Sequence, residues 1–266
     1  MFAMHTKTKQ QVLLAAVFFL TTLAALAQEP GEKANQTDAA PSRIPGSKNL
    51  QDAVEKMAHT VSVDTSPANR DPADIKPEAK ELKDIGQDLF FRKNRPQEGI
   101  EKIEAAIKID PRMPDAYNTL WSYYGVAKHD FQTAKRYLEA GAKHCPKSSS
   151  VRFDLGTLYS AMNRPKDAVE QFQIALDLGI ESKAPVFYNI GNQYHKQGNL
   201  SAAIVSWKNA LATDEKHLNA RRNLAIAYVQ SGDLKAARKE MQRLVDLDPN
   251  GDKGAWAREG LQTIQP

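Results

Sequence analysis

The pattern of apolar and polar residues is clearest in residues 184–251, where one helical arrangement occurs twice. The first copy places aromatic, aliphatic and small residues at Phe187, Ile190, Gly191, Tyr194, Gly198, Ala203 and Trp207. The second copy follows 34 residues later, at Arg221, Leu224, Ala225, Tyr228, Gly232, Ala237 and Met241. Spacings of three and four residues are typical of the buried face of a helix, and a glycine between two such runs indicates a turn. Each copy is therefore predicted to form two amphipathic helices.

Three further copies are found when the period is projected toward the N-terminus. The predicted repeats cover residues 80–113, 114–148, 149–183, 184–217 and 218–251. Asn163, Gly198 and Gly232 suit the left-handed backbone of a helix–helix turn. In the repeat that begins near 114, Tyr124 and Ala134 are ten residues apart, where nine is the usual spacing. We expect the additional residue to lengthen the turn at residues 128–130.

This arrangement resembles the tetratricopeptide repeat, which has a period of about 34 residues and the pattern W-x2-L-G-x2-Y…A-x3-F…P. The resemblance implies an all-α fold, a right-handed α-solenoid of about five tandem helix-turn-helix repeats over residues 80–251. Each repeat has an apolar face that only a neighbour can cover. Residues 252–266, with Trp256 at helical spacing, are therefore expected to form a C-terminal capping helix.

The first 27 residues have the pattern of a secretory signal peptide. Lys7 and Lys9 precede an apolar run of 16 residues that ends in Ala25-Leu26-Ala27. The run is shorter than the roughly 20 residues that span a bilayer, so cleavage after Ala27 is favoured over a retained anchor. The mature chain is expected to be exported, either to the periplasm or out of the cell, without a membrane anchor.

Residues 28–79 contain six prolines among many Ala, Ser, Asn and Asp residues, a composition typical of a flexible linker. Leu50, Val54 and Met57 fall at helical spacing and indicate a short helix at residues 49–59. This helix either docks on the solenoid or remains free within the linker.

Composition narrows the classes of partner and chemistry. Of the 266 residues, 41% are apolar and 26% are charged, with a net charge of +4 and both signs interspersed. This balance does not indicate nucleic acid as a partner. Cys145 is the only cysteine, so the chain cannot form an internal disulfide. A small, half-buried residue at a repeat corner is expected there, although a lone thiol in an exported protein can also pair between chains.

The sequence contains no motif of a metalloprotease, a serine hydrolase or a phosphate-binding loop. His129, His144 and Cys145 are the one group in which a soft metal is conceivable, and they lack the further ligand that such a site needs. We therefore expect no catalytic residue, no metal and no cofactor.

Helical rotation of about 100° per residue identifies the face of each first helix that points away from the core. In the family, this face lines a concave groove that holds an extended peptide or a partner's helix. The resemblance thus implies a groove whose predicted binding residues are Tyr188, Asn189, Asn192, Lys196, Arg222 and Asn223. Asn189 and Asn223 occupy matching places in adjacent repeats and either bond a ligand backbone at two points or are solvated polar residues. The same rotation places Ile226 and Val229 on the free face.

Charge along this face is predicted to be uneven. Glu81, Asp84 and Asp88 lie at one end, and Lys196 and Arg222 lie toward the other. The distribution predicts that an acidic segment or a C-terminal carboxylate of the ligand lies near Lys196 and Arg222.

Three hypotheses for function follow. The first is an exported scaffold that binds protein or peptide partners in its groove during cell-envelope assembly or quality control. The second is a structural envelope component that associates with copies of itself and leaves the groove unused; the oligomeric state is left open. The third is a metal carrier or enzyme that uses His129, His144 and Cys145.

Overall fold

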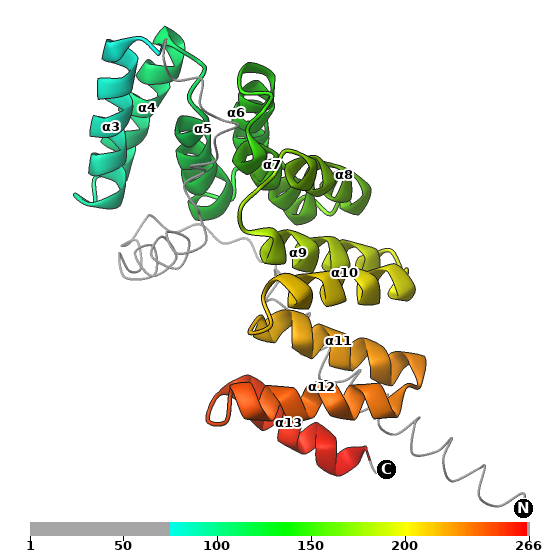
Figure 1. Cartoon of the computed structure of the whole chain (residues 1–266). Helices are drawn as coiled ribbons and strands as arrows, with labels where there is room; N and C mark the ends of the chain where they lie inside the picture. Colours follow the sequence, from blue (N-terminus) through cyan, green and yellow to red (C-terminus); the bar gives the residue numbers. More distant parts are fainter. Residues whose placement is uncertain (1–74, 265–266) are drawn as a thin grey trace, which may run out of the picture. The chain divides into compact units, whose positions relative to one another are not determined.

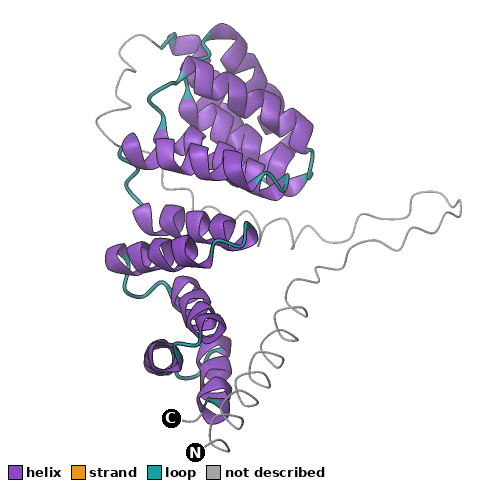
Figure 2. Cartoon of the chain, turned by 90° about the vertical axis from the view of Figure 1, so that its right-hand side faces the viewer, coloured by secondary structure: helices purple, strands orange, loops and turns teal. Residues whose placement is uncertain are grey.

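The computed structural model describes residues 75–264, in which eleven α-helices, one π-helix and no β-strand occur (Figures 1 and 2). The all-α prediction is therefore confirmed for this part of the chain. The helices divide into two compact units, residues 75–199 and residues 200–264. The predicted signal peptide, the predicted helix at residues 49–59 and nearly all of the predicted linker lie outside the described residues.

The first unit is built from helical hairpins in which α3 packs on α4, α5 and η2 pack on α6, and α7 packs on α8. Its elements are α3 (Pro77–Phe91), α4 (Pro96–Ile109), α5 (Pro114–Leu120), η2 (Trp121–Ala127), α6 (Phe131–His144), α7 (Ser149–Ala161), α8 (Pro165–Asp177) and α9 (Lys183–Lys196). Successive hairpins contact each other through α4 and α5, α6 and α7, and α8 and α9. The first helices also touch directly, α5 against α7 and α7 against α9.

Prolines determine where several of these helices begin. Pro77, Pro96, Pro114 and Pro165 each occupy the first turn of a helix. There the fixed φ of proline suits the helix, and its missing N–H leaves no hydrogen bond unmade. Helix α3 accordingly begins at Pro77, three residues before the first predicted repeat.

The turns of the first unit contain residues with a left-handed backbone. Asn94, His129 and Asn163 have φ values of 52°, 54° and 55°, and Gly198 has a φ of 75°. The prediction for Asn163 and Gly198 is confirmed. Asparagine tolerates this region because its short polar side chain bonds locally, whereas histidine is a less common choice.

The second unit contains α10 (Leu200–Thr213), α11 (Leu218–Ser231), α12 (Leu234–Leu247) and α13 (Asp252–Thr263). Helices α11 and α12 form a hairpin that turns at Gly232, where φ is 80° as predicted. The N-cap of α11 is His217, whose Nδ1 accepts a hydrogen bond from the Ala220 N–H at 3.1 Å. Helix α13 packs on α12 and also contacts α11, so it covers this last hairpin as a capping helix should.

The apolar cores lie between the helices of each unit. In the first unit, Tyr117, Leu138 and Leu158 belong to one cluster, and Phe172 and Val186 belong to another. In the second unit, the core joins α11, α12 and α13 through Ala225, Met241, Leu244, Ala257 and Ile264. Burial of each large apolar side chain contributes about 1.5–3 kcal/mol, so these contacts provide most of the stability of the stack.

The additional residue of the second repeat does not lengthen the turn, so that expectation is wrong. The left-handed residue lies five positions after Tyr124, at His129, but only four after Tyr159, at Asn163. The small residue of the second helix then follows five positions after the left-handed residue in both repeats, at Ala134 after His129 and at Ala168 after Asn163. The first helix absorbs the insertion as the π-helix η2, in which the Lys128 N–H donates to the Tyr123 carbonyl oxygen at 3.0 Å. A π-bulge accommodates one extra residue without breaking the helix.

The wider backbone of η2 brings Gly125 against the indole of Trp121. A Cβ atom at Gly125 would lie 1.9 Å from Cζ3 of Trp121 and 2.0 Å from its Cε3. Trp121 is only 6% exposed, so its ring has little room to move. Glycine is therefore needed at position 125 for close packing.

We predict that Gly125→Ala destabilises the protein by about 1–3 kcal/mol, because the added methyl group overpacks a filled core and displaces Trp121. Urea unfolding followed by circular dichroism measures the change. In a Trp121→Leu background, the same substitution should cost markedly less, since the clashing ring is gone. A single variant as stable as the wild type would contradict this account of η2.

Candidate functional site

The predicted binding residues lie on two helices that belong to different units. Tyr188, Asn189, Asn192 and Lys196 are on α9 in the first unit, and Arg222 and Asn223 are on α11 in the second. Lys196 is exposed and the other five are half-buried. The structure thus groups four of the six residues on one helix and the remaining two on another.

Helix α9 has the orientation predicted from its periodicity. Ile190 and Gly191 are buried, and Tyr188 and Asn192 on the other side are half-buried. Sequence analysis missed Gln193, which is 2% exposed and whose Nε2 donates to the Ser160 Oγ at 2.8 Å. This bond ties α9 to α7, and no apolar period identifies such a residue. The half-buried side of α9 therefore carries aromatic and amide groups, and the Gln193–Ser160 bond on its buried side fixes the helix against α7.

Helix α11 departs from its prediction because the last helix covers part of it. Val229 is 3% exposed and packs in the core that contains Ala257, and Ile226 is 9% exposed. The expectation that both lie on a free face is wrong. The Arg222 guanidinium lies over the Trp256 ring of α13, 5.1 Å from its centroid. Rotation along one helix cannot show that a later helix packs over it.

At the acidic end of the predicted face, Asp84 and Asp88 are paired with lysine side chains. The Lys83 ammonium is 3.0 Å from Asp84 and 3.8 Å from Asp115, and its side chain is 15% exposed. Lys93 pairs with Asp88 at 2.7 Å and lowers the pKa of that carboxyl. Lys83 directly precedes Asp84 and Lys93 follows Asp88 by five residues, whereas Asp115 is on α5. Part of the negative charge on α3 is therefore balanced locally.

A group of buried polar side chains lies on α5, η2 and α7, the first helices of the second and third repeats. Asn118 and Thr119 on α5, Ser122 on η2 and Asp154 on α7 are all less than 9% exposed. Burial raises the pKa of the Asp154 carboxyl well above its usual range, and neighbouring charges do not contribute to this shift. Polar side chains thus occupy positions where the second and third repeats approach each other.

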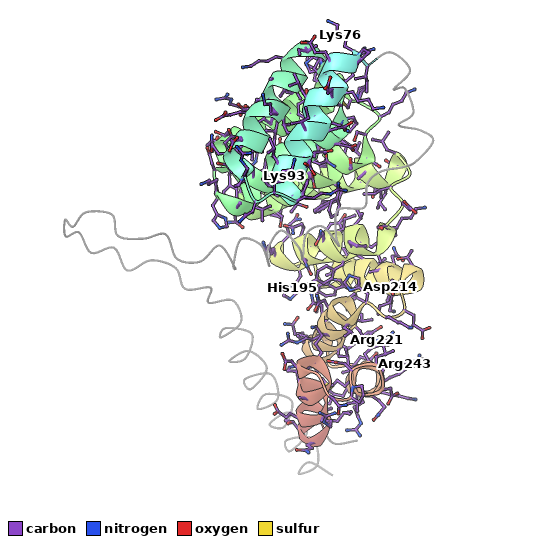
Figure 3. All side chains as sticks on the ribbon, turned by 90° about the vertical axis from the view of Figure 1, so that its left-hand side faces the viewer. Lys76, Lys93, His195, Asp214, Arg221 and Arg243 are labelled. Atoms are coloured by element: carbon purple, nitrogen blue, oxygen red, sulfur yellow. The ribbon has the colours of Figure 1, made fainter. Side chains whose placement is uncertain are left out.

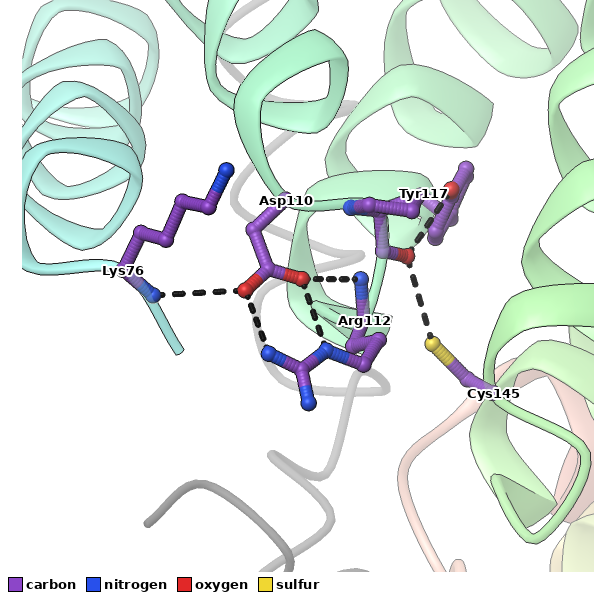
Figure 4. Close-up of polar contacts among 6 residues, drawn as sticks. Lys76, Asp110, Arg112, Tyr117 and Cys145 are labelled. Carbon is purple, nitrogen blue, oxygen red and sulfur yellow. Dashed lines mark hydrogen bonds and ion pairs between the residues drawn. The ribbon is translucent and has the colours of Figure 1, made fainter. Parts of the chain in front are cut away.

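The corner between the first and second repeats is fixed by Asp110, which is 2% exposed (Figure 4). Its Oδ2 accepts from the Lys76 backbone N–H at 3.2 Å and from Nη2 of Arg112 at 2.8 Å. Its Oδ1 accepts from the Arg112 backbone N–H and from Nε at 3.1 and 3.0 Å. The Arg112 guanidinium holds the pKa of this carboxyl well below its usual range. Asp110 therefore stays ionised and joins α3 to the second repeat.

Cys145 lies at the same corner, as expected. Its Sγ donates to the Pro111 carbonyl oxygen at 3.7 Å, and the Tyr117 hydroxyl donates to the same oxygen at 3.0 Å (Figure 4). The thiol is buried, and burial raises its pKa to about 12. A protonated, buried thiol is a poor nucleophile and a poor metal ligand.

A buried ion pair supports the hairpin of the second unit. Arg221 is 4% exposed and donates from Nη1 to Glu240 at 2.6 Å and from Nη2 to the Glu215 carbonyl oxygen at 2.7 Å. Arg243, labelled with Arg221 in Figure 3, donates to the Glu215 carboxylate at 2.7 Å. Arg221 takes the place of Phe187 in the preceding repeat, and its Nη1 and Nη2 partners offset part of the cost of burial, while its Nε has no hydrogen-bond partner in the described chain.

Within residues 75–264, no three His, Cys, Asp or Glu side chains are grouped as a metal site requires. His129, His144 and Cys145 therefore do not form the cluster that the third hypothesis needs. Among the same residues, no helix is long and apolar enough to cross a membrane.

Comparison with known proteins gives the family of these hairpins. Two sequence patterns, both described as tetratricopeptide repeat, match residues 153–207 and 194–258. Residues 153–258 are tetratricopeptide repeats. No curated protein sequence matches it.

Solved tetratricopeptide-repeat structures share the fold. PilW, described as a widely conserved type IV pilus biogenesis factor, superposes with a TM-score of 0.59 and 21% identity over 71% of this chain and 90% of its own. YrrB, described as a TPR protein with an unusual peptide-binding site, superposes with a TM-score of 0.57 and 20% identity, over 68% of this chain and 92% of its own. MamA from Desulfovibrio magneticus RS-1 superposes with a TM-score of 0.58 and 18% identity, over 67% of this chain and 99% of its own. At these identities the likeness establishes the solenoid fold alone.

We predict that Asp154→Asn stabilises the protein at neutral pH. The folded state binds the Asp154 proton more tightly than the unfolded state, so wild-type stability falls as pH rises above about 4, the unfolded pKa. The amide cannot ionise and removes this fall. Thermal melts at pH 4 and 7.5 should show similar midpoints at the lower pH and a higher midpoint for the variant at the upper one. Glu170→Gln, at an exposed position on α8, is the control and should change neither value. A variant less stable than the wild type at pH 7.5 would contradict the prediction.

Proposed function

We propose that this tetratricopeptide-repeat protein is an exported, non-catalytic scaffold that binds a protein or peptide partner on the surface of its first helices. The observation that carries the proposal is the surface of α9, where Tyr188, Asn189 and Asn192 lie half-buried opposite Ile190 and Gly191. Side chains in this state are partly desolvated and held in position, yet retain area for contact with a ligand.

The chemistry of this surface suits a polypeptide ligand. An asparagine amide offers two donors and an acceptor, which match the C=O and N–H groups of a peptide backbone. A tyrosine adds a large apolar ring with a polar tip at little cost in conformational entropy. Tyr188 and Asn192 are one helical turn apart, so both contact the same stretch of a bound chain.

Sequence and relatives support a place in the cell envelope. Residues 1–27 combine basic residues, an apolar run and the Ala25-Leu26-Ala27 end of an export signal. One structural neighbour, PilW, is described as a pilus biogenesis factor. We therefore propose that the scaffold acts in assembly or quality control outside the cytoplasm.

Site-specific photo-crosslinking in the native host tests the binding surface. A photoreactive residue at Asn192 should give discrete products with a partner, and one at exposed Lys166 on α8 should give none. Adding Asn189→Ala should weaken the Asn192 product. Absence of product at Asn192 would overturn the proposal, and products formed only between copies of this protein would replace it with the self-associating structural role.

Mass spectrometry of the protein from the envelope fraction tests export. The mature chain is expected to begin at Gln28, and Ala27→Leu should block cleavage because the residue before the cut must be small. A full-length chain retained in the cytoplasm would contradict export.

A further inference from the structure

Ile85 on α3 occupies a position at which each of the later repeats has a buried side chain. It is the aliphatic residue directly before Gly86. Successive steps of 34 or 35 residues lead from it to its counterparts, Leu120, Leu155, Ile190 and Leu224. These four side chains are at most 5% exposed, whereas Ile85 is 42% exposed. Helix α3 thus leaves open an apolar side chain that the later repeats remove from water.

The counterparts are buried by the second helix of the preceding hairpin. Leu155 shares a core cluster with Leu138 of α6, and Ile190 shares one with Phe172 of α8. The same contact between a second helix and the next first helix occurs for α4 with α5 and for α10 with α11. Within residues 75–264, no helix precedes α3, so α3 lacks this cover.

The side of α3 that faces α4 is already filled. A Cβ atom on Gly86 would lie 2.7 Å from the Gly99 carbonyl oxygen and 2.9 Å from Cδ1 of Ile103. Ile85 is rotated by about 100° from this contact and lies one helical turn from Leu82, which is half-buried. Ile85 and Leu82 therefore form an apolar strip on the side where a preceding helix would pack.

An array of helical hairpins needs a cover at each end, because a terminal hairpin has one apolar face without a neighbour. The last hairpin has such a cover in α13, which packs on α12 and α11. The strip on α3 is the corresponding open face of the first hairpin.

The sequence before α3 contains one segment suited to cover this strip. In the later hairpins, only four or five residues separate a second helix from the first helix that follows. A helix at that distance before α3 would contain Pro67, which removes a helical hydrogen bond and clashes with the preceding turn. The nearest stretch with helical spacing is residues 49–59, through Leu50, Val54 and Met57.

The connecting residues are long enough to bring this segment back to α3. Residues 60–76 reach about 55 Å when extended, at roughly 3.3 Å per residue. Helix α3 has 15 residues and is about 22 Å long. The segment can therefore reach either end of α3, and its tether keeps it at an effective concentration of about millimolar.

A second copy of the chain is less suited to cover the same strip. Glu78 and Glu81 lie on the Ile85 side of α3, both are exposed, and neither forms an ion pair within the described chain. Pairing of α3 with another α3 would bring these like charges together, which is unfavourable. Residues 48–59 have two acids and two lysines and so add no net charge.

We propose that residues 49–59 form a helix that packs over Ile85 and Leu82 and covers the first hairpin. Its apolar side takes the place of a preceding second helix and consists of Leu50, Val54 and Met57. The cap goes beyond the proposed binding function, because it concerns how the array of hairpins ends and not what it binds.

Photo-crosslinking within one chain tests the cap on purified protein that begins at Gln28. Benzoylphenylalanine in place of Ile85 should give a product that mass spectrometry maps to residues 49–59. The same probe in place of Lys80, which is exposed on another side of α3, should not. An equal mixture of unlabelled and nitrogen-15-labelled protein separates the two cases, because products within a chain carry one label and products between chains carry both.

Val54→Asp should reduce the product from position 85 about tenfold, because the cap would have to bury an unpaired charge. Gln51→Asp makes the same change in net charge away from the predicted apolar side and should leave most of the product. Both substitutions lie outside the described hairpins, and circular dichroism checks that the helix content of the hairpins is kept.

The cap would be refuted if position 85 gave no product with residues 49–59, gave products only between chains, or gave the same yield in Val54→Asp. Products only between chains would indicate that the strip is covered by a second copy. None of these results bears on crosslinking from Asn192, so the cap and the binding surface of α9 are tested separately.

Discussion

The close approach of paired helices, clearest in the first and third hairpins, is the constraint on which the rest of the structure depends. In the first hairpin, a Cβ on Gly86 would lie 2.7 Å from the Gly99 carbonyl oxygen, and one on Gly99 would lie 2.6 Å from that of Gly86. In the third, Phe172 packs so closely on Gly156 that a Cβ there would lie 2.6 Å from its ring. Backbones at this distance leave no space for water, so each hairpin is a rigid block whose outer faces must be covered by a neighbour.

Stacking of such blocks explains why polar groups are buried on the first helices. The second helices fill the space between hairpins with apolar side chains such as Leu138, Phe172 and Met241. The first helices meet along a narrower seam, where Ser122, Asp154 and Gln193 are also excluded from water. Gln193 finds Ser160, whereas Asp154 finds no donor for Oδ2 in the described chain. The seam thus holds polar groups that its own chain satisfies only in part.

Periodicity predicted most of the fold and only part of the candidate site. It located the hairpins, the turns at Asn163, Gly198 and Gly232, and the buried side of α9, since all of these repeat with the chain. It misplaced the extra residue near Tyr124, because residue counts show an insertion but not whether helix or turn absorbs it. It also left Ile226 and Val229 on a free face, because burial of a helix by later parts of the chain, as of Val229 in the core that contains Ala257 of α13, depends on tertiary packing. Nor does a period reveal the Arg222–Trp256 stack or the Lys83 pairs, since each depends on side-chain conformation.

The cations predicted to bind a ligand and the buried acceptors that lack a hydrogen-bond partner lie on different helices. The sequence drew attention to Lys196 and Arg222 and hence to an acidic segment, but the Arg222 guanidinium already lies over the ring of Trp256. In the first unit, Thr119, Ser122 and Thr157 donate their protons within their own helices, and Oδ1 of Asn118 and Oδ2 of Asp154 have no hydrogen-bond partner in the described chain. An exposed charge is paired cheaply by water and salt, whereas a buried acceptor is not. Within the described chain, Asn118 Oδ1 and Asp154 Oδ2 are therefore the costlier groups to leave unpaired.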